Sequence, residues 1–360
     1  MKEPDSIALA PAPPSRAWEA LRRVSLSLAL ASLLIGILAL LASSDPGATL
    51  SAFFIAPFRS RSLFPAILEN AAPLALAALG VLVSFRAGHF SLGGEGQLYF
   101  GALFAAFAGI YAPEGYLGLA LALAAGALGG LLVAAPAAAG KRWAGADVLL
   151  TTFLLSQAAI FIADWAIAGP LRDPNNNLVA MAAIPRASLL PRLSPPTILS
   201  PAPFLALAAI ILGWFFFSRC KRGHQLSIYG KNPLFARLQG FPVRAFSWQP
   251  VLFAGAAHGL AGALLSLGPN GTAVRGISGG IGWSAIGVSL IAGNEALALP
   301  FAALLFSWLD AGSRQASIVS DLPPDAALVV KALVIMAATA KPLIKRFMAR
   351  RAAAKTEACA

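Results

Sequence analysis

Long apolar runs alternate with short polar segments along most of the chain. Many of the runs approach the roughly 20 apolar residues that a helix needs to cross a hydrocarbon core. Charged residues, glycine and proline separate them, which predicts helices that enter and leave a membrane in turn. The pattern predicts about ten transmembrane helices, with eight as the lower bound, at 24–42, 63–85, 97–110, 117–139, 148–168, 203–217, 246–267, 277–292, 297–309 and 326–343.

Composition supports the same class of protein. Of the 360 residues 58% are hydrophobic and 12% are charged, and the mean hydropathy is +0.75. Soluble domains carry about a quarter charged residues, so a water-soluble fold could not hide this much apolar surface. We therefore expect an all-α integral membrane protein with a cytoplasmic segment at 1–23, a transmembrane domain at 24–343 and a basic cytoplasmic tail at 344–360.

The net charge of +12 comes from lysines and arginines grouped at the ends of apolar runs. They cluster before residue 24, at Lys141-Arg142, in the polar segment 219–245 and in the tail. This distribution is typical of cytoplasmic loops and places both termini in the cytoplasm, with the protein in the cell inner membrane. It argues for contact with membrane lipid and against a nucleic-acid partner, because the charges follow the membrane boundaries.

One polar stretch, 86–97, lies between two apolar runs and carries four glycines. Ionisable residues at membrane depth are costly and usually face a protein interior or a watery path. We interpret Glu95 and Gln97 as candidates for a translocation path, together with His89 and Ser91. For Arg86 and His89 a tight cytoplasmic turn is an equal alternative.

The glycine motif 93–97 has a counterpart at 279–283, which also lies at a junction of two spans. In the predicted topology the first motif is at the inner end of a span pair and the second is at the outer end. That placement favours an inverted-topology repeat with the path at the repeat interface.

Other polar residues are weaker candidates for the path. Glu69 and Asn70 could face it or could hydrogen-bond neighbouring helices, and Trp283 with Ser284 could line it or belong to an interfacial belt. His258 is interpreted as a packed polar residue. Asp310 and Lys331 could pair between the last two spans.

The polar segment 219–245 contains a predicted short helix. Asn232 can cap it, Pro233 suits its first position and Gly240 suits its end. Leu234, Phe235 and Leu238 would share an apolar face. That face favours a docking site for a cytoplasmic partner and an interfacial helix on the lipid headgroups equally.

The chain resembles permease subunits of ATP-binding-cassette (ABC) importers for nucleosides and simple sugars, which are related to the branched-chain amino acid permeases. The resemblance covers roughly 63–312. It rests on the segments 73–80, 85–97, 230–240, 254–263, 279–287 and 304–306. Four positions differ from the usual family pattern and leave the solute open: His89, Ser91, Gly94 and Phe235.

The resemblance implies a permease driven by separate cytoplasmic ATP-binding subunits. They would dock on the coupling helix, whose matching residues are Gly230, Asn232, Pro233, Phe235, Ala236 and Gly240. It further implies a second, identical or different permease and an extracytoplasmic solute-binding protein. The expected solute is a nucleoside or a simple sugar.

Two other classes of protein are weighed against this one. The chain has no phosphate-binding Gly-x-x-x-x-Gly-Lys-Ser/Thr loop, so ATP hydrolysis would come from a partner. A self-sufficient secondary transporter would couple through a buried carboxylate such as Glu69 or Glu95. A membrane enzyme would need clustered ligands, whereas the three histidines are far apart in the sequence. We therefore expect no catalytic residues, metal or cofactor.

Overall fold

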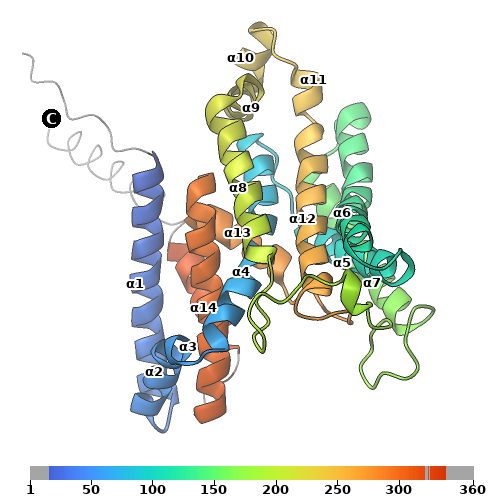
Figure 1. Ribbon diagram of the computed structural model, residues 1–360. Helices are drawn as coiled ribbons and strands as arrows, with labels where there is room; N and C mark the ends of the chain where they lie inside the picture. The colour runs from blue at the N-terminus through green and yellow to red at the C-terminus, as the bar shows by residue number, and fades with distance from the viewer. Residues whose placement is uncertain (1–15, 321–322, 324, 338–360) are drawn as a thin grey trace, which may run out of the picture.

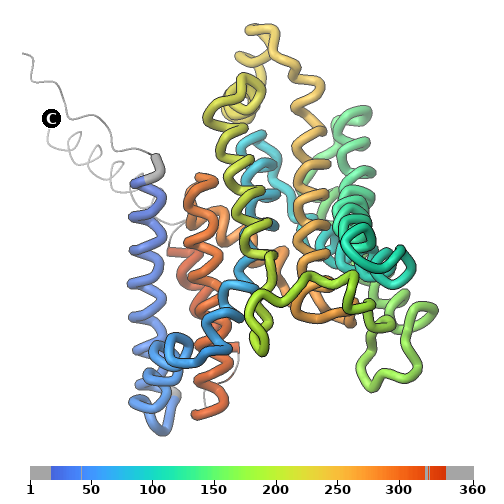
Figure 2. Tube along the Cα trace, viewed as in Figure 1, coloured from blue at the N-terminus to red at the C-terminus, as the bar shows by residue number. Residues whose placement is uncertain are grey.

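The computed structural model describes residues 16–320, 323 and 325–337. The predicted tail 344–360 and most of segment 1–23 lie outside these residues. The described chain is helical, and its β-structure is limited to one isolated antiparallel bridge between Ala180 and Val274. The long helices stand side by side, with the short helices α9 to α11 at one end and the loop 169–201 at the other (Figures 1 and 2).

The helices are, in chain order, α1 (Arg16–Ala42), α2 (Pro46–Phe54), α3 (Ala56–Arg59), α4 (Leu63–Arg86), α5 (Gly94–Tyr111), α6 (Tyr116–Ala144), α7 (Val148–Ala168), η1 (Arg186–Ser188), α8 (Ala202–Arg219), α9 (Lys221–Lys231), α10 (Pro233–Leu238), α11 (Val243–Phe246), α12 (Gln249–Leu267), α13 (Ile281–Ile291), η2 (Ala296–Ala298) and α14 (Leu299–Val319). A further short apolar helix covers Ala326–Ala337.

Seven helices in the described part of the chain are long and apolar enough to cross a membrane, by length and composition. They correspond to α1, α4, α6, α7, α8, α12 with the preceding residues, and α14. The all-α membrane class is therefore confirmed, whereas the count of ten spans is not. Two of the remaining predicted spans contain the shorter apolar helices Ile281–Ile291 and Ala326–Ala337, and residues 338–343 of the second predicted span lie outside the described residues. The third is α5, which begins with the polar residues Glu95 and Gln97.

Two element boundaries differ from the prediction for identifiable reasons. The helix expected from residue 277 begins at Ile281, because Gly276, Gly279 and Gly280 adopt positive φ angles, a conformation outside the right-handed helix. The helix expected to end at residue 309 continues to Val319. Asp310 is tolerated inside it because Lys331 Nζ lies 2.8 Å from its carboxylate, as the sequence suggested.

The helices α4 and α12 form the centre of the bundle and are the most buried of the long helices. Glycines let neighbouring backbones come very close to α12. A Cβ on Gly101 of α5 would lie 2.3 Å from Gly259 Cα, and one on Gly130 of α6 would lie 2.1 Å from Gly255 O. Small residues provide this close packing inside membranes, where lipid supplies no hydrophobic force between helices.

Each central helix is the first of three consecutive helices, called here a trio, and the two central helices run in opposite directions. Helix α4 runs toward the end that carries α9 to α11 and is followed by α5 and α6, whereas α12 runs away from that end and is followed by α13 and α14 (Figure 1). Each central helix also packs against the two followers of the other one. This reciprocal arrangement is the one that an inverted-topology repeat produces.

Candidate functional site

The two glycine motifs meet inside the bundle. Glu95, at the start of α5, accepts hydrogen bonds from the backbone N–H groups of Gly280 (2.9 Å) and Gly282 (2.8 Å) at the start of α13. A Cβ on Gly282 would lie 2.3 Å from the Glu95 nitrogen, so only glycine permits this contact. No side chain of its own caps α13. The carboxylate of Glu95 therefore supplies that cap and complements the helix dipole.

Gln97 and His258 form a second buried contact next to the motifs. His258 Nδ1 lies 2.9 Å from Gln97 Oε1, and each residue is 1% exposed. With Gln97 Oε1 facing the ring, the contact requires the tautomer that has its proton on Nδ1, because the amide oxygen can only accept. Gly80 and Gly94 leave the room that the imidazole occupies, since a Cβ on either would lie within 3.2 Å of the ring. The interpretation of His258 as a packed polar residue agrees with this geometry.

Hydroxyl groups of α7 hold the entry into α5. The Leu92 N–H donates to Thr152 Oγ1 (3.1 Å), and the Gly96 N–H donates to Ser156 Oγ (2.8 Å). Ser91 is buried beside them, and its Oγ accepts from the Gly93 N–H at 3.4 Å. Sequence reasoning missed Thr152 and Ser156. Their spacing of four residues, which places two hydroxyls on one face of an apolar helix, was the available signal.

Trp283 and Ser284 lie in the first turn of α13, directly after the second glycine motif. Trp283 is 40% exposed, and its ring packs edge-on against Phe153 of α7 at 6.2 Å between centroids. Ser284 is partly buried and donates its backbone N–H to Gly280 O. Of the path residues predicted around the two motifs, Trp283 has the most accessible side chain.

Glu69 and Asn70 lie in the other half of α4, away from α9 to α11. The Glu69 carboxylate accepts from the backbone N–H (2.8 Å) and the hydroxyl (2.7 Å) of Ser200. It therefore ties α4 to the end of the loop 169–201. Asn70 is partly buried. The structure does not bring this pair into contact with the glycine motifs.

The connection between α4 and α5 contacts the predicted coupling segment 230–240. Gly88, at φ +75°, faces Gly230, where a Cβ would lie 2.1 Å from Arg86 O. His89 Nε2 lies 3.1 Å from Phe246 O. Burial lowers the pKa of His89 from its usual value, which favours the neutral imidazole. His89 thus lies against α11 and not beside Glu95.

Arg86 joins the same region to the second trio. Its guanidinium contacts Glu295 at 2.9 Å, donates to Asn294 O at 2.9 Å and lies over the Phe217 ring of α8. Planar guanidinium groups suit such combined ionic and stacking contacts. The ends of α4, α8 and α13 are therefore linked at this side of the bundle.

The predicted short helix is present as α10, with both of its ends capped. Asn232 accepts from the Phe235 N–H at 2.9 Å, and Pro233 occupies the first position. Gly240 adopts φ +71°, and the Gly240 and Phe241 N–H groups bond to Arg237 O and Ala236 O. This pair of bonds is the Schellman motif, so the expected cap at Gly240 is confirmed.

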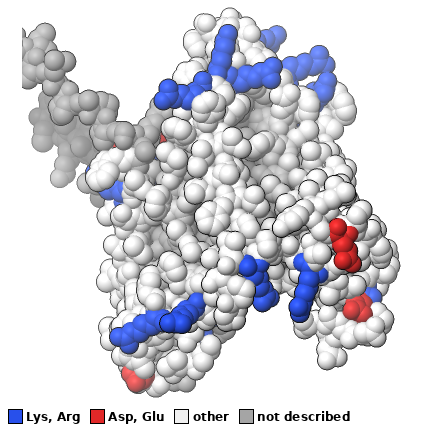
Figure 3. Space-filling model, viewed as in Figure 1, with Lys and Arg blue, Asp and Glu red and all other residues white. Residues whose placement is uncertain are grey.

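The apolar residues of α10 point outward. Leu234, Phe235 and Leu238 are 67%, 46% and 77% exposed, whereas Ala236 is fully buried. Lysines and arginines gather over the same end of the molecule (Figure 3). A capped helix that presents apolar side chains within a basic surface suits either a docking contact with another macromolecule or a position on the lipid headgroups.

Comparisons with known proteins decide between the candidate classes. Residues 64–339 match the family described as "Branched-chain amino acid transport system / permease component". The chain belongs to this permease family.

Individual relatives agree with the family. The permease is 33% identical to the "Probable riboflavin import permease protein RfuC" of Treponema pallidum, over 84% of this chain and 80% of that protein. It is 30% identical to the guanosine ABC transporter permease protein NupP of Bacillus subtilis, over 73% and 77%. It is 27% identical to the glucose ABC transporter permease protein TsgB13 of Haloferax volcanii, over 88% and 87%.

The protein is therefore a multi-pass membrane permease of the ABC transporter class, and the secondary-transporter alternative is set aside. Permeases of this class are transport components that work with ATP-binding subunits and solute-binding proteins. The segment 230–240, singled out from the resemblance, covers the last two residues of α9, the helix α10 with its exposed apolar face, and the cap that ends α10.

Proposed function

We propose that this permease carries a nucleoside or a simple sugar across the cell inner membrane, with both termini in the cytoplasm. The observation that carries the proposal is α10, a capped helix with exposed Leu234, Phe235 and Leu238. An ATP-binding subunit would seat this apolar face in a groove. The energy of ATP hydrolysis would come entirely from that subunit.

The route of coupling follows the contacts at the cytoplasmic end. Movement of α10 would reach α4 through the backbone contact of Gly230 with Arg86 and Gly88. It would reach α13 through Arg86 and Glu295. Because α5 and α13 both begin at the glycine motifs, a shift of either trio would change how the first turns of these two helices meet. Such a rearrangement is a route to alternating access.

The remaining partners follow from the same orientation. A second permease, identical or different, would complete the path along the face where α7 and α13 present Phe153 and Trp283. A solute-binding protein would deliver the solute at the opposite end, where the loop 169–201 lies. Glu69 supports that end by holding Ser200.

The aromatic pair favours a nucleoside over a sugar. Flat heteroaromatic rings stack on aromatic side chains, with about 1–3 kcal/mol per base in nucleic-acid complexes. Trp283 is 40% exposed, and its ring packs edge-on against Phe153. The names of two relatives specify riboflavin and guanosine, both of which contain such rings.

Substitution of Trp283 tests the solute class. In proteoliposomes containing the whole importer, Trp283→Ala should reduce uptake of labelled guanosine about tenfold, as expected from the loss of one stacking contact. Trp283→Phe should retain most of the uptake. The matched control is Trp165→Ala, which removes an exposed tryptophan from the end of α7 and should leave uptake unchanged. Uptake of glucose in place of guanosine would contradict the nucleoside assignment.

A further inference from the structure

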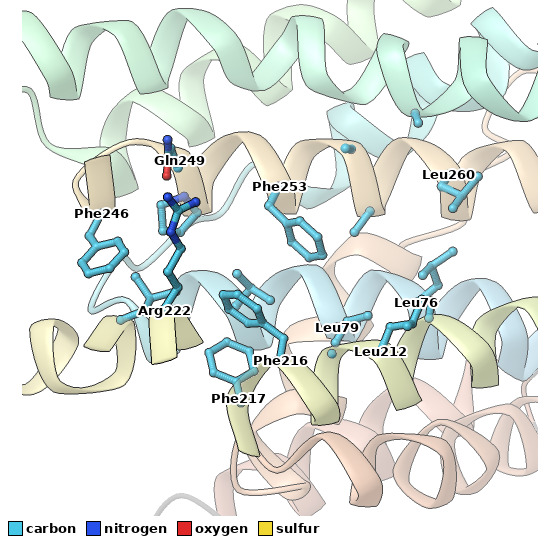
Figure 4. A pocket seen from close by; sticks show the side chains of 18 residues that line it. Leu76, Leu79, Leu212, Phe216, Phe217, Arg222, Phe246, Gln249, Phe253 and Leu260 are labelled. Carbon is cyan, nitrogen blue, oxygen red and sulfur yellow. The ribbon is translucent and has the colours of Figure 1, made fainter. Parts of the chain in front are cut away.

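A groove lies between α8 and α12 on a face of the bundle that the proposed path does not use. It encloses a cavity of about 560 Å³ whose floor is formed by Leu76, Leu79 and Val83 of α4. Helix α8 forms one wall and α12 forms the other, with Phe216 and Phe253 projecting between them (Figure 4). The groove is thus framed by the two helices that α9 to α11 connect.

Small residues create this hollow. Gly213 brings α8 close to α4, since a Cβ there would lie 2.7 Å from Leu79 Cδ1. On the opposite wall Ala256 and Ala257 line the cavity where larger side chains would fill it. The two helices therefore stay apart while each remains packed on α4.

The lining is suited to a hydrocarbon chain. Its residues are almost all aliphatic or aromatic, and its polar side chains, Arg222 and Gln249, lie near each other at one end (Figure 4). A hydroxylated solute in the middle of the groove would lose its hydrogen bonds to water and gain none. An acyl chain would lose nothing and would bury apolar surface.

The dimensions match one leaflet of a bilayer. From Pro250 to Leu260 the wall formed by α12 rises about 15 Å at 1.5 Å per residue, which is about half of a hydrocarbon core of roughly 30 Å. Arg222 lies in the first turn of α9, at one end of the groove, and is exposed. Among the described residues it has no ion pair. Its guanidinium is therefore available at the depth where lipid phosphates lie.

We propose that this groove binds one acyl chain of an anionic phospholipid of the cytoplasmic leaflet, with the lipid phosphate on Arg222. The choice of leaflet rests on the proposed orientation of the permease. Because Leu226 and Phe246 also line the groove, the bound lipid contacts both α9 and α11. It thereby braces the two helices that carry α10.

Lipid retention by the purified full-length permease tests the site without any ATP-binding subunit. Native mass spectrometry would compare phosphatidylglycerol with phosphatidylcholine of identical acyl chains. The wild type should retain phosphatidylglycerol about fivefold more tightly, the preference expected from one cation near an anionic lipid surface. Arg222→Gln should remove this preference, whereas Arg219→Gln, which removes an exposed arginine outside the groove, should keep it.

A second variant tests the acyl-chain part of the site. Ala256→Phe should fill the groove and reduce retention of both lipids at least tenfold, with an unchanged melting temperature showing that the fold is intact. Equal retention of the two lipids by the wild type, or an unchanged preference in Arg222→Gln, would overturn the proposal. Disulfide-linked dimers formed through Leu212→Cys in native membranes would overturn it too, because a second permease chain would then occupy the groove.

These experiments test the lipid site and the transport function independently of each other. Retention is measured on the permease alone, so an importer that carries another solute would leave the lipid result unchanged. Conversely, loss of lipid selectivity would leave the ATP-driven uptake of the wild type as evidence for the permease function.

Discussion

Replacing Gly230 by alanine is expected to lower the melting temperature of the permease and to reduce ATP-driven uptake at least tenfold. The new Cβ would lie 2.1 Å from Arg86 O and 2.8 Å from Ala87 C. These are backbone atoms, which cannot swing aside as the end of a side chain can. Overpacking of this kind costs about 1–3 kcal/mol. The cost falls on the contact that joins the coupling segment to α4.

The matched control is Gly36→Ala in α1, because a Cβ at Gly36 would have no atom within 4 Å. This substitution should preserve uptake and slightly raise the melting temperature, since alanine favours helix more than glycine by about 1 kcal/mol. Thermal unfolding and uptake are measured on the same preparations. Equal behaviour of the two variants would show that the contact between Gly230 and Arg86 does not transmit coupling.

Replacing Glu95 by alanine is expected to destabilise the permease by about 1.5–3 kcal/mol, the range for hydrogen bonds to a charged group. The change removes the acceptor from the Gly280 and Gly282 N–H groups and leaves the start of α13 without its cap. Glu95→Gln keeps one acceptor oxygen and should lose about half as much. In both variants the residual uptake should still require ATP.

Thermal unfolding measures the change in stability. Uptake measured with and without a protonophore shows whether transport depends on a proton gradient. Glu114→Ala is the control, because Glu114 is an exposed carboxylate in the connection between α5 and α6. If Glu95→Gln matched the wild type in stability but lost all uptake, Glu95 would be a solute or proton site. Its role as the cap of α13 would then be wrong.

The parts of the structure that the sequence predicted are those determined by local chemistry. Asn232, Pro233 and Gly240 define α10 because capping acts within a few residues of the helix ends. The apolar runs predict the long helices for the same reason, since each run must hydrogen-bond internally in lipid. The predicted start of α13 is wrong because glycine is compatible with an apolar span, and the sequence does not show that these glycines adopt positive φ angles.

The parts that the sequence could not predict depend on contacts between distant elements. The sequence predicts Glu95 as a path residue but does not predict that its carboxylate accepts from the Gly280 and Gly282 N–H groups. Glu69 likewise binds Ser200, a residue more than a hundred positions away. A buried carboxylate has the same sequence signature in a path as in a cap, because in both cases it needs polar partners at membrane depth.

Docking of an ATP-binding subunit on α10 is the central claim, and co-purification from native membranes tests it most directly. The variant Leu234→Asp with Leu238→Asp changes two exposed residues and leaves both helix caps intact. The control is Leu193→Asp, an exposed leucine in the loop 169–201. We expect the ATP-binding subunit to accompany the wild type and the control and to be absent from the double variant. Equal recovery with all three proteins, or no recovery after cross-linking of the wild type, would contradict the account.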